Sequence, residues 1–414
     1  MRVHRGTREI GGSCVELEAD GERIVLDAGR PLSASMDEQV PMLAVSGFGG
    51  CVDTSLLGVV LSHSHPDHYG LMSAIHPAVA AWAGAAASRV LKEAAYFTPA
   101  GLNRTWNGHL RDRQRFKLGT FTVTPFLVDH SAFDAYAFLV EANGRRLFYS
   151  GDLRAHGRKA SAFQRLVVEP PRDIDVLLLE GTRVGPEGQH LRSAATERDV
   201  ERSCIDFFRE TEGLALVAYS PQNIDRLVTL YRAAVQSDRD FVMDLYAATM
   251  AKATGNPNIP QAGWDRVRVF VPHAQRLRVL RSREFERVRA VRRARIFADE
   301  LRQKRGELVL SFRPSMAAEL ERMDCLLGAS VLWSMWSGYL EEPRMQAFTD
   351  FLERNRIPMT THHASGHASV RDLQRFAQAL APRRVVPIHT AAPERFPDLF
   401  DRVEMHRDGE WWEV

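Results

Sequence analysis

Six consecutive residues, HSHPDH at positions 63–68, combine three imidazoles and one carboxylate in an HxHxDH pattern. Side chains two residues apart on an extended backbone point to the same side, so His63 and His65 are expected to hold one metal ion. Asp67 and His68 belong to the turn that follows and would hold a second ion. The pattern therefore predicts a binuclear metal site rather than a group of surface histidines.

Two metal ions require more ligands than this segment supplies, and further candidates stand directly after predicted strands. His130, Asp152 and His389 each follow a short apolar run. An isolated His or Asp at such a place is normally a turn residue, but behind HxHxDH the three together indicate metal ligands. Asp27 also follows an apolar run, and we expect it to orient a ligand histidine by a hydrogen bond.

The elements that must position these residues are recognisable from their apolar patterns. The first part of the chain predicts strands over 13–18, 23–26, 56–61, 121–128, 137–141, 146–150 and 175–180. The pair Asn143-Gly144 predicts a tight hairpin. An alanine-rich stretch, 77–95, is expected to be helical. This combination of predicted strands and a helix indicates an α/β domain with a mixed sheet.

After Glu180 the pattern changes to that of a smaller α/β domain. Strands are expected over 214–219 and 240–245, separated by a helix over 223–235, which is typical of a parallel sheet. Past residue 358, a helix over 370–380 and a strand over 384–388 lead to His389.

Composition narrows the class of protein. With 414 residues, 45% hydrophobic and 26% charged, the chain is expected to fold into two or three domains. The net charge of +2 indicates no nucleic-acid binder as a whole, yet residues 271–305 contain twelve Arg and Lys against four Asp and Glu. That segment is either a solvated helix surface or a surface that faces phosphates.

The spacing of the cysteines and the lack of long apolar segments indicate a cytoplasmic protein without a membrane partner. The four cysteines are far apart, with no CxxC pair, and are expected to be reduced. No segment approaches the roughly 18 apolar residues of a membrane span, and the first residues lack the apolar run of a signal peptide.

The chemistry-bearing segments, taken in order, resemble a known family. HSHPDH, the isolated His130 and the Gly-Asp of YSGDLR resemble the metallo-β-lactamase fold. Glu180 in LLLEGT, His367 in ASGHAS and His389 in PIHT resemble the additional motifs of the β-CASP nucleases, a group that includes RNase J. SPQNIDRL, which starts at Ser220, is similar to the RNase J form of the inserted domain. The resemblance covers about residues 10–395.

The resemblance implies a fold and a domain division. The fold would be an αββα metallo-β-lactamase sandwich with an inserted α/β β-CASP domain. Residues 1–180 and 360–414 would form the metallo-β-lactamase domain, and residues 181–359 the β-CASP insert.

It also implies a ligand set of two Zn²⁺ ions, with Mn²⁺ as the alternative. One ion would be held by His63, His65, His130 and Asp152, and the other by Asp67, His68, Asp152 and His389. Water activated between the ions would attack a phosphodiester. His367 would contact the scissile phosphate or act as an acid, and Glu180 would support it.

A phosphate-binding pocket is a further implication. The loop at Ser365, Gly366 and Ser369 precedes a helix, whose N-terminus favours phosphate. With the Ser220 region, it would recognise a 5′-terminal phosphate, as in RNase J relatives. The chain departs from the family at Gly181, where Ser is frequent, and after His389, where RNase J commonly reads Gly-Glu.

Four functions compete. The first is a ribonuclease acting on single-stranded RNA, as 5′-3′ exonuclease, endonuclease or both. The second applies the same chemistry to single-stranded DNA, since only the 2′-hydroxyl distinguishes the two locally. The third, a small-molecule ester or lactone hydrolase, leaves Glu180, His367 and the ~180-residue insert unexplained. The fourth, a non-catalytic binding protein, conflicts with the complete ligand set. We favour the first, and the oligomeric state stays open.

Overall fold

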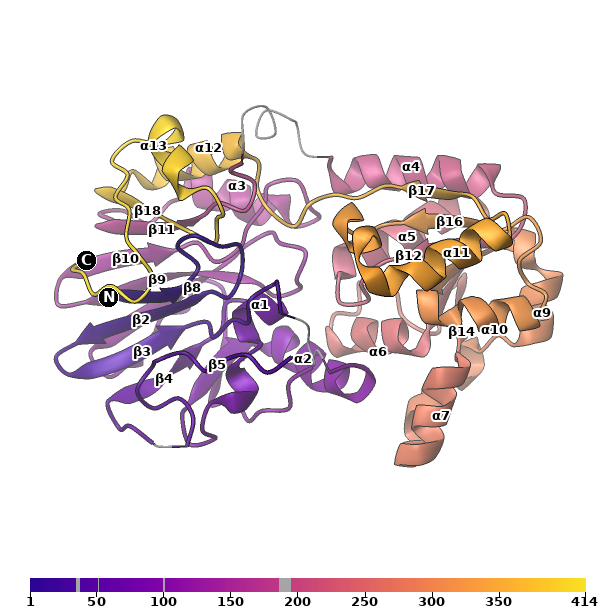
Figure 1. Cartoon of the computed structure of the whole chain (residues 1–414), viewed down its shortest axis with the longest axis horizontal. Helices are drawn as coiled ribbons and strands as arrows, with labels where there is room; N and C mark the ends of the chain where they lie inside the picture. Colours follow the sequence, from indigo (N-terminus) through magenta and orange to yellow (C-terminus); the bar gives the residue numbers. More distant parts are fainter. Residues whose placement is uncertain (35–37, 51, 100, 186–194) are drawn as a thin grey trace. The chain divides into compact units, whose positions relative to one another are not determined.

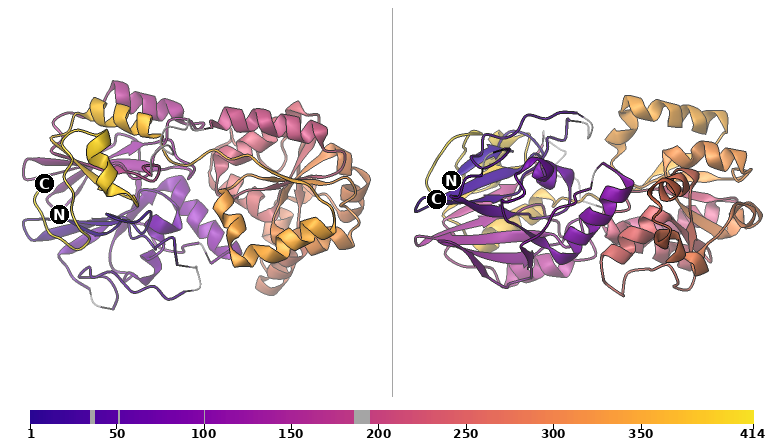
Figure 2. Two further views of the ribbon diagram at one scale, coloured as in Figure 1. Left: turned by 45° about the horizontal axis from the view of Figure 1, so that its top comes forward. Right: turned by 90° about the horizontal axis from the view of Figure 1, so that it is seen from below.

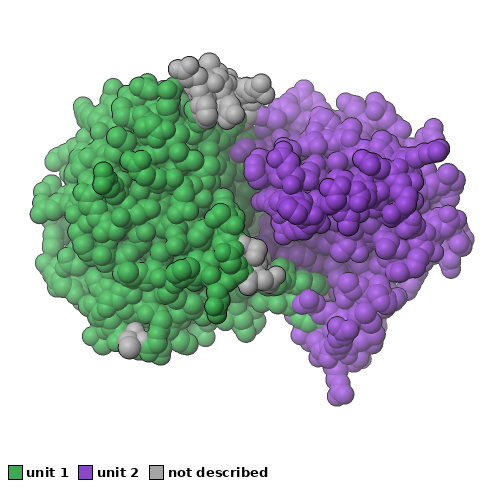
Figure 3. All heavy atoms as spheres, viewed as in Figure 1, with its two compact units in different colours: residues 1–194, 366–414 green, residues 195–365 purple. Residues whose placement is uncertain are grey.

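The computed structural model describes residues 1–34, 38–50, 52–99, 101–185 and 195–414. The chain forms two compact units, Met1–Ala194 with Gly366–Val414, and Ala195–Ser365 (Figure 3). The sequence placed the interruption of the first domain at 181–359. Three six-stranded sheets organise the chain (Figure 1).

The first unit contains two mixed sheets that lie face to face (Figure 2). The first sheet has the order β1 (Arg2–Arg5), β2 (Cys14–Ala19), β3 (Glu22–Leu26), β4 (Leu56–Val60), β5 (Ala81–Gly84) and β6 (Gly108–Leu110). The second has the order β18 (Arg384–Ile388), β11 (Val176–Glu180), β10 (Arg145–Tyr149), β9 (Tyr136–Ala142), β8 (Phe121–Leu127) and β7 (Phe116–Leu118).

Alternate side chains of these strands divide between the inner and outer faces of the sheets. In β11, Val176 and Leu178 join the core between the two sheets. Leu177 and Leu179 join a separate core on the outer face. A strand buried on both faces needs an uninterrupted apolar run, which explains why VLLLE contains no polar residue before Glu180.

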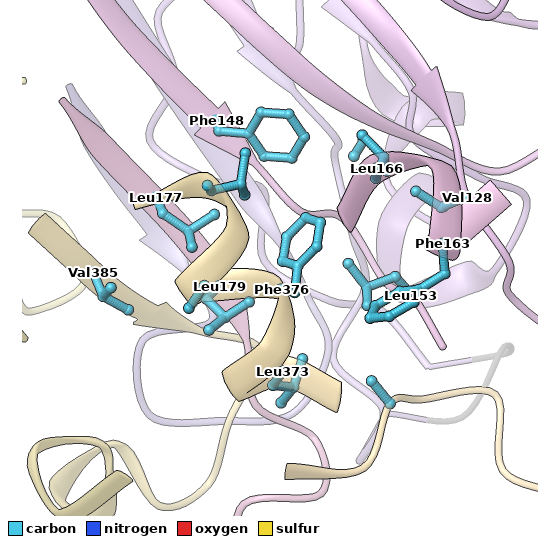
Figure 4. Close-up of a cluster of buried hydrophobic side chains, with 14 of the residues drawn as sticks. Val128, Phe148, Leu153, Phe163, Leu166, Leu177, Leu179, Leu373, Phe376 and Val385 are labelled. Carbon is cyan, nitrogen blue, oxygen red and sulfur yellow. The ribbon is translucent and has the colours of Figure 1, made fainter. Parts of the chain in front are cut away.

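Helices cover both outer faces. Leu91 of α2 (Ala85–Phe97) and Tyr69 of the short α1 (Pro66–Tyr69) pack on the first sheet. On the second sheet, Phe376 of α12 (Val370–Leu380) packs against both Phe148 and Phe163 of α3 (Ala160–Val168) (Figure 4). The last helix, α13 (Phe396–Leu399), adds to the same core. The predicted αββα sandwich is confirmed.

Strand direction brings four strand ends to one edge of the second sheet. β10, β11 and β18 are parallel neighbours, and β8 runs the same way because β9 is antiparallel to both β8 and β10. The residues that follow these strands therefore meet at the same edge. The hairpin between β9 and β10 turns at Asn143 and Gly144, both with positive φ, as the sequence predicted.

The second unit is the predicted smaller parallel domain. The neighbouring strands of its sheet are parallel. Their order is β14 (Val267–Phe270), β13 (Asp240–Asp244), β15 (Leu308–Phe312), β12 (Ala215–Ala218), β16 (Ser330–Trp333) and β17 (Met359–Thr361). Its helices are α4 (Glu197–Glu210), α5 (Ile224–Gln236), α6 (Leu245–Ala253), α7 (His273–Ser282), α8 (Glu286–Arg289), α9 (Ala298–Gln303), α10 (Ala317–Arg322) and α11 (Gln346–Arg354).

One predicted element is wrong in part. The helix expected over 77–95 begins only at Ala85, because Ala81–Gly84 forms β5 between β4 and β6. Alanine favours helices. In β5, however, the ring of Trp82 lies against Gly58 of β4 and Gly108 of β6, which have no side chains to displace it. Sheet pairing therefore outweighs local propensity here.

Cys14, Cys204 and Cys325 are free and buried, as expected, whereas Cys51 lies outside the described residues. Among the helices that the structure describes, none combines the length and apolar character that crossing a bilayer requires.

Candidate metal centre

The HxHxDH segment turns directly from strand into helix. β4 ends at Val60, and His63 and His65 follow on the connecting loop. His65 has an extended backbone (φ −94°, ψ 144°) and caps α1, which begins at Pro66. Proline suits the first helical position, where no amide donor is needed. Asp67 and His68 are thereby held on the first turn of α1, and both are buried.

The other predicted ligands follow strands of the second sheet, at the shared edge. His130 follows β8, Asp152 follows β10 and His389 follows β18. His389 has φ +53°, and Gly151, just before Asp152, has φ +52°. A left-handed backbone at a histidine costs free energy, and such strain is found where the surrounding structure fixes a functional side chain.

The ligand atoms meet in two groups that share one carboxylate. The atoms of each group lie within 4.8 Å of one another. The first group is His63, His65, His130 and Asp152, and the second is Asp67, His68, Asp152 and His389. Asp152 Oδ2 lies 3.2 Å from His68 Nε2, 3.7 Å from His63 Nε2 and 3.7 Å from His389 Nε2. All seven predicted ligands are thus brought together.

Unsatisfied buried atoms show that this cluster fits metal ions. His63 Nε2, His68 Nε2 and both carboxylate oxygens of Asp152 are buried without a hydrogen-bond partner. An unpaired buried polar atom costs about 1–3 kcal/mol, and four at one place would be a large penalty. Imidazole nitrogens and carboxylate oxygens are ligands for zinc and similar ions, so bound cations would satisfy these atoms.

Burial sets the protonation of the histidines in the first group. Removal from water lowers the pKa of His63 and of His130 well below the ordinary value, and lowers that of His65 to about 4. These imidazoles are therefore neutral near pH 7, which is the form that binds a metal. Burial alone would raise the pKa of Asp152, but His389, His68 and His367 outweigh it and keep the carboxylate ionised.

Asp27 contacts His68, which is one of the predicted metal ligands. Its Oδ2 accepts a hydrogen bond of 2.7 Å from His68 Nδ1, which turns His68 Nε2 toward Asp152. Tyr149 donates its hydroxyl to the same oxygen at 2.7 Å, and Ser62 donates both its amide and its hydroxyl to Asp27. Sequence analysis missed Ser62 and Tyr149, although both adjoin ligand-bearing segments.

Two more contacts fix ligand rings. His130 Nδ1 donates to the carbonyl oxygen of Gly366 at 2.6 Å, and Thr182 Oγ1 lies 2.8 Å from His389 Nδ1. Such partners set which ring nitrogen faces the metal. Sequence analysis also missed Thr182, which stands two residues after Glu180 in the EGT segment that carries the family resemblance.

His367 and Glu180 form a pair beside the ligands. His367 Nδ1 lies 3.4 Å from Glu180 Oε1 and 3.8 Å from Asp152 Oδ2. Burial alone would lower the pKa of His367, but Glu180 and Asp152 raise it to about 9. The nearby Glu180 thus favours the protonated imidazole, and about a fifth of the His367 side chain is exposed.

The predicted phosphate-binding residues are not all brought together by one unit. Gly366 and Ser369 belong to the first unit, whereas Ser220 and Ser365 belong to the second. Ser369 caps α12, because its hydroxyl accepts from the Asp372 amide at 3.1 Å and lies 2.7 Å from the Asp372 carboxylate. A helix-capping role thus accounts for this serine.

Comparisons with known proteins agree with this geometry. Residues 24–204 match the family model described as the beta-lactamase superfamily domain, and residues 358–394 match the Zn-dependent metallo-hydrolase RNA specificity domain. Ribonuclease J of Mycoplasma genitalium is 24% identical over 247 residues, which are 56% of this chain and 42% of that protein. Ribonuclease J of Mycoplasma pneumoniae gives the same figures.

The chain thus combines a beta-lactamase superfamily domain with a segment like the RNA specificity domain of Zn-dependent metallo-hydrolases, and it is similar to RNase J-like, β-CASP proteins. It matches less than half the length of these curated relatives. A crystal structure of a protein of unknown function from Enterococcus faecalis V583 has a TM-score of 0.75 with 19% identity, and the match covers 99% of this chain and 98% of that one. That likeness concerns the fold alone. The matched models and the site geometry together indicate the fold and a metal-binding side-chain cluster typical of metallo-hydrolases.

Proposed function

We propose that this chain is a two-metal phosphodiesterase that hydrolyses single-stranded RNA. The observation that carries the proposal is the pair of ligand groups sharing Asp152. Two ions held by these residues would supply an activated water and would neutralise the charge that develops on the phosphate oxygens. Zn²⁺ suits the five imidazole ligands, with Mn²⁺ as the alternative.

The chain's own residues prepare this chemistry. Asp27, Thr182 and the Gly366 carbonyl hold ligand rings in one orientation. His367 is partly exposed and Glu180 favours its protonated form, so it can donate a hydrogen bond to a phosphate oxygen or a proton to the leaving oxygen. Glu180 keeps that imidazole protonated and fixes its position. Both roles are part of the proposal.

RNA is proposed as the substrate because of the names given to the relatives and to one of the matched domains. The curated relatives are named ribonucleases, and the second matched model is described as an RNA specificity domain. Recognition of a 5′-phosphate by Ser220, Ser365, Gly366 and Ser369 stays a prediction. Ser220→Ala tests it better than Ser369→Ala, because loss of the Ser369 cap would itself destabilise α12 by about 1 kcal/mol.

The test uses three end-labelled oligonucleotides of one sequence: 5′-phosphate RNA, 5′-hydroxyl RNA and 5′-phosphate DNA. Each is incubated with the metal-loaded protein, with Asp67→Ala and with Asp401→Ala, an exposed carboxylate of the same unit. We expect RNA cleavage by the wild type and by Asp401→Ala, and none by Asp67→Ala. His68→Ala should behave like Asp67→Ala, with the fold retained.

The products decide the mode and the substrate. Mononucleotides released from the phosphorylated end indicate a 5′-3′ exonuclease, and internal fragments regardless of the 5′ end indicate an endonuclease. DNA cleavage at an equal or higher rate would move the assignment to a DNA nuclease. Metal-dependent hydrolysis of lactones or thioesters without cleavage of any strand would overturn the proposal.

A further inference from the structure

A cluster of positive charge lies in the second unit, which contains none of the metal ligands. Residues 271–305 include twelve Arg and Lys and four Asp and Glu, although the net charge of the whole chain is only +2. Eleven of the twelve cations are arginines. Arginine binds phosphate in a bidentate manner and stacks on flat rings, whereas lysine acts as a compact, strongly hydrated charge.

This segment contributes little to the core of its unit. We define the arginine arm as residues 272–297, which include α7 and α8. α7 buries only Val279 and α8 buries no residue. Figure 1 shows α7 projecting from the unit, and Figure 3 shows the same projection as spheres. Most side chains of the arm therefore face solvent, and the buried exceptions are Pro272, Val279, Val291, Ala294 and Ile296.

Part of the positive charge is neutralised within the arm and part is not. Arg287 pairs with Glu284, and Arg289 with Glu286. Four other exposed arginines, at positions 281, 283, 292 and 293, make no ion pair within 4.0 Å among the residues that the structure describes. Four unneutralised guanidinium groups on twelve or so residues of chain favour an anionic partner.

Two exposed aromatic rings accompany these arginines in the sequence: Phe285 lies between Arg283 and Arg292, and Phe297 follows Arg293 by four residues. Phe285 is 46% exposed and Phe297 is 56% exposed. The guanidinium of Arg295 lies over the Phe297 ring, 4.6 Å from its centre. Exposed aromatic rings offer stacking surfaces to unpaired bases, and interleaved cations bind the backbone that joins those bases. Neither feature is required by a merely solvated helix.

We propose that the arginine arm binds single-stranded RNA, with its four unpaired arginines on backbone phosphates and Phe285 and Phe297 against bases. The inference rests on the proposed function, since it assigns part of substrate binding to the second unit. An acidic protein would satisfy the same charges, but it would leave the two aromatic rings without flat partners.

The experiment measures RNA affinity against salt concentration. A quartet variant carries Arg281→Gln, Arg283→Gln, Arg292→Gln and Arg293→Gln. The control quartet changes Arg198, Arg209, Arg354 and Arg356 to Gln; these are exposed in the same unit, and Arg356 shares the positive φ of Arg283. Metal-loaded proteins are titrated into a labelled single-stranded RNA whose phosphorothioate linkages resist hydrolysis, and fluorescence anisotropy is recorded.

We expect the quartet variant to bind at least about tenfold more weakly at ~0.1 M salt, and the control quartet to stay within about twofold of the wild type. The slope of log affinity against log salt should fall by about 0.7 for each phosphate contact removed. Changing the same four arginines to Lys should keep that slope. The double variant Phe285→Ala and Phe297→Ala should weaken RNA binding without changing the slope of log affinity against log salt.

Failures of the two proposals are distinguishable. If the quartet variant matches the control quartet while the wild type still cleaves RNA, the arm is not an RNA-binding surface. If sedimentation shows that the quartet variant alters self-association and not RNA affinity, the arm contacts protein and the inference is overturned. If the wild type neither binds nor cleaves RNA, the proposed function itself has failed.

Discussion

Each unit contains a cluster of buried charged side chains, and the clusters around Arg226 and around Asp152 differ in whether their members satisfy one another. In the second unit, Arg226 donates to Glu197 at 3.0 Å and to the Ser334 carbonyl at 2.7 Å, and Thr229 donates to Glu197 at 2.8 Å. In the first unit, Asp152 Oδ2 lies within 4.0 Å of five imidazoles, yet neither carboxylate oxygen of Asp152 has a hydrogen-bond partner.

The difference separates a structural network from a functional one. A network that satisfies its own hydrogen bonds has no capacity left for a ligand, and its loss is felt in stability. A cluster with unpaired ligand atoms is incomplete until cations bind, and its loss is felt in chemistry. Substitutions in each cluster should therefore change different measured quantities.

The largest expected effect is that of Asp152→Ala. Removal of the shared carboxylate takes a ligand from both metal groups, so kcat/KM for RNA should fall by roughly 10⁴-fold or more. Metal content by mass spectrometry should fall in parallel, while circular dichroism shows the fold retained. Near-normal activity with two bound ions would contradict the shared-ligand assignment.

Arg226→Met should give the opposite result. It leaves Glu197 buried without its cation, so the free energy of unfolding should fall by about 3–5 kcal/mol, as measured by urea denaturation. Arg232→Met is the matched control on the same helix, because Arg232 is more than half exposed and its pair with Glu201 is worth at most about 1 kcal/mol. If Arg226→Met lost bound metal at urea concentrations below its unfolding transition, the Arg226 cluster would affect metal binding as well as stability, which would contradict the comparison.

Asp27→Asn should have an intermediate effect. The amide is a weaker acceptor for His68 Nδ1, so metal affinity should fall by about 10–100-fold, measured by competition with a chelator. Tyr149→Phe removes one hydroxyl from the same carboxylate and should have a smaller effect. Equal metal affinity in the wild type and Asp27→Asn would show that His68 is fixed by packing alone.

The smallest expected effect concerns Glu16, a closed network within the first unit. Burial alone would raise the pKa of Glu16, but hydrogen bonds from His4, Arg2 and Arg23 lower it to about 2. The ionised form therefore stabilises the fold above the unfolded pKa of about 4.3, and this contribution is lost as the pH falls toward 2.

Glu16→Gln should consequently be less stable than the wild type by about 1–2 kcal/mol at pH 6, with a smaller difference at pH 3. Urea denaturation at both pH values measures it. Glu18→Gln, exposed on the same strand, is the control. A gap that widens as the pH falls would show that the network does not hold the charge.

Much of the centre was predictable because its ligands obey strand geometry. His130, Asp152 and His389 each follow an apolar run, and parallel strand ends share an edge. Asp27 was found for the same reason. Ser62, Tyr149 and Thr182 were not, because serine, tyrosine and threonine are common and their roles depend on which partner the fold brings near.

The fold was predictable where apolar runs were long and turns carried a signal. The hairpin at Asn143-Gly144 and the strand before Glu180 were both found in this way. The start of α2 was missed because alanine at positions 81 and 83 suits a helix by propensity, whereas β5 exists only through its neighbours β4 and β6. Local sequence does not contain that information.

The separation of the ligands along the chain has a consequence for synthesis. His389 Nε2 lies 3.0 Å from Asp67 Oδ2, although the two residues are 322 positions apart in the sequence. At roughly 5–20 residues per second, a ribosome needs about 15–60 s to add the second ligand after the first. Until then β18 is missing from its sheet and the second metal position lacks a ligand. The nascent chain thus stays without a complete centre while it is close to its own messenger RNA.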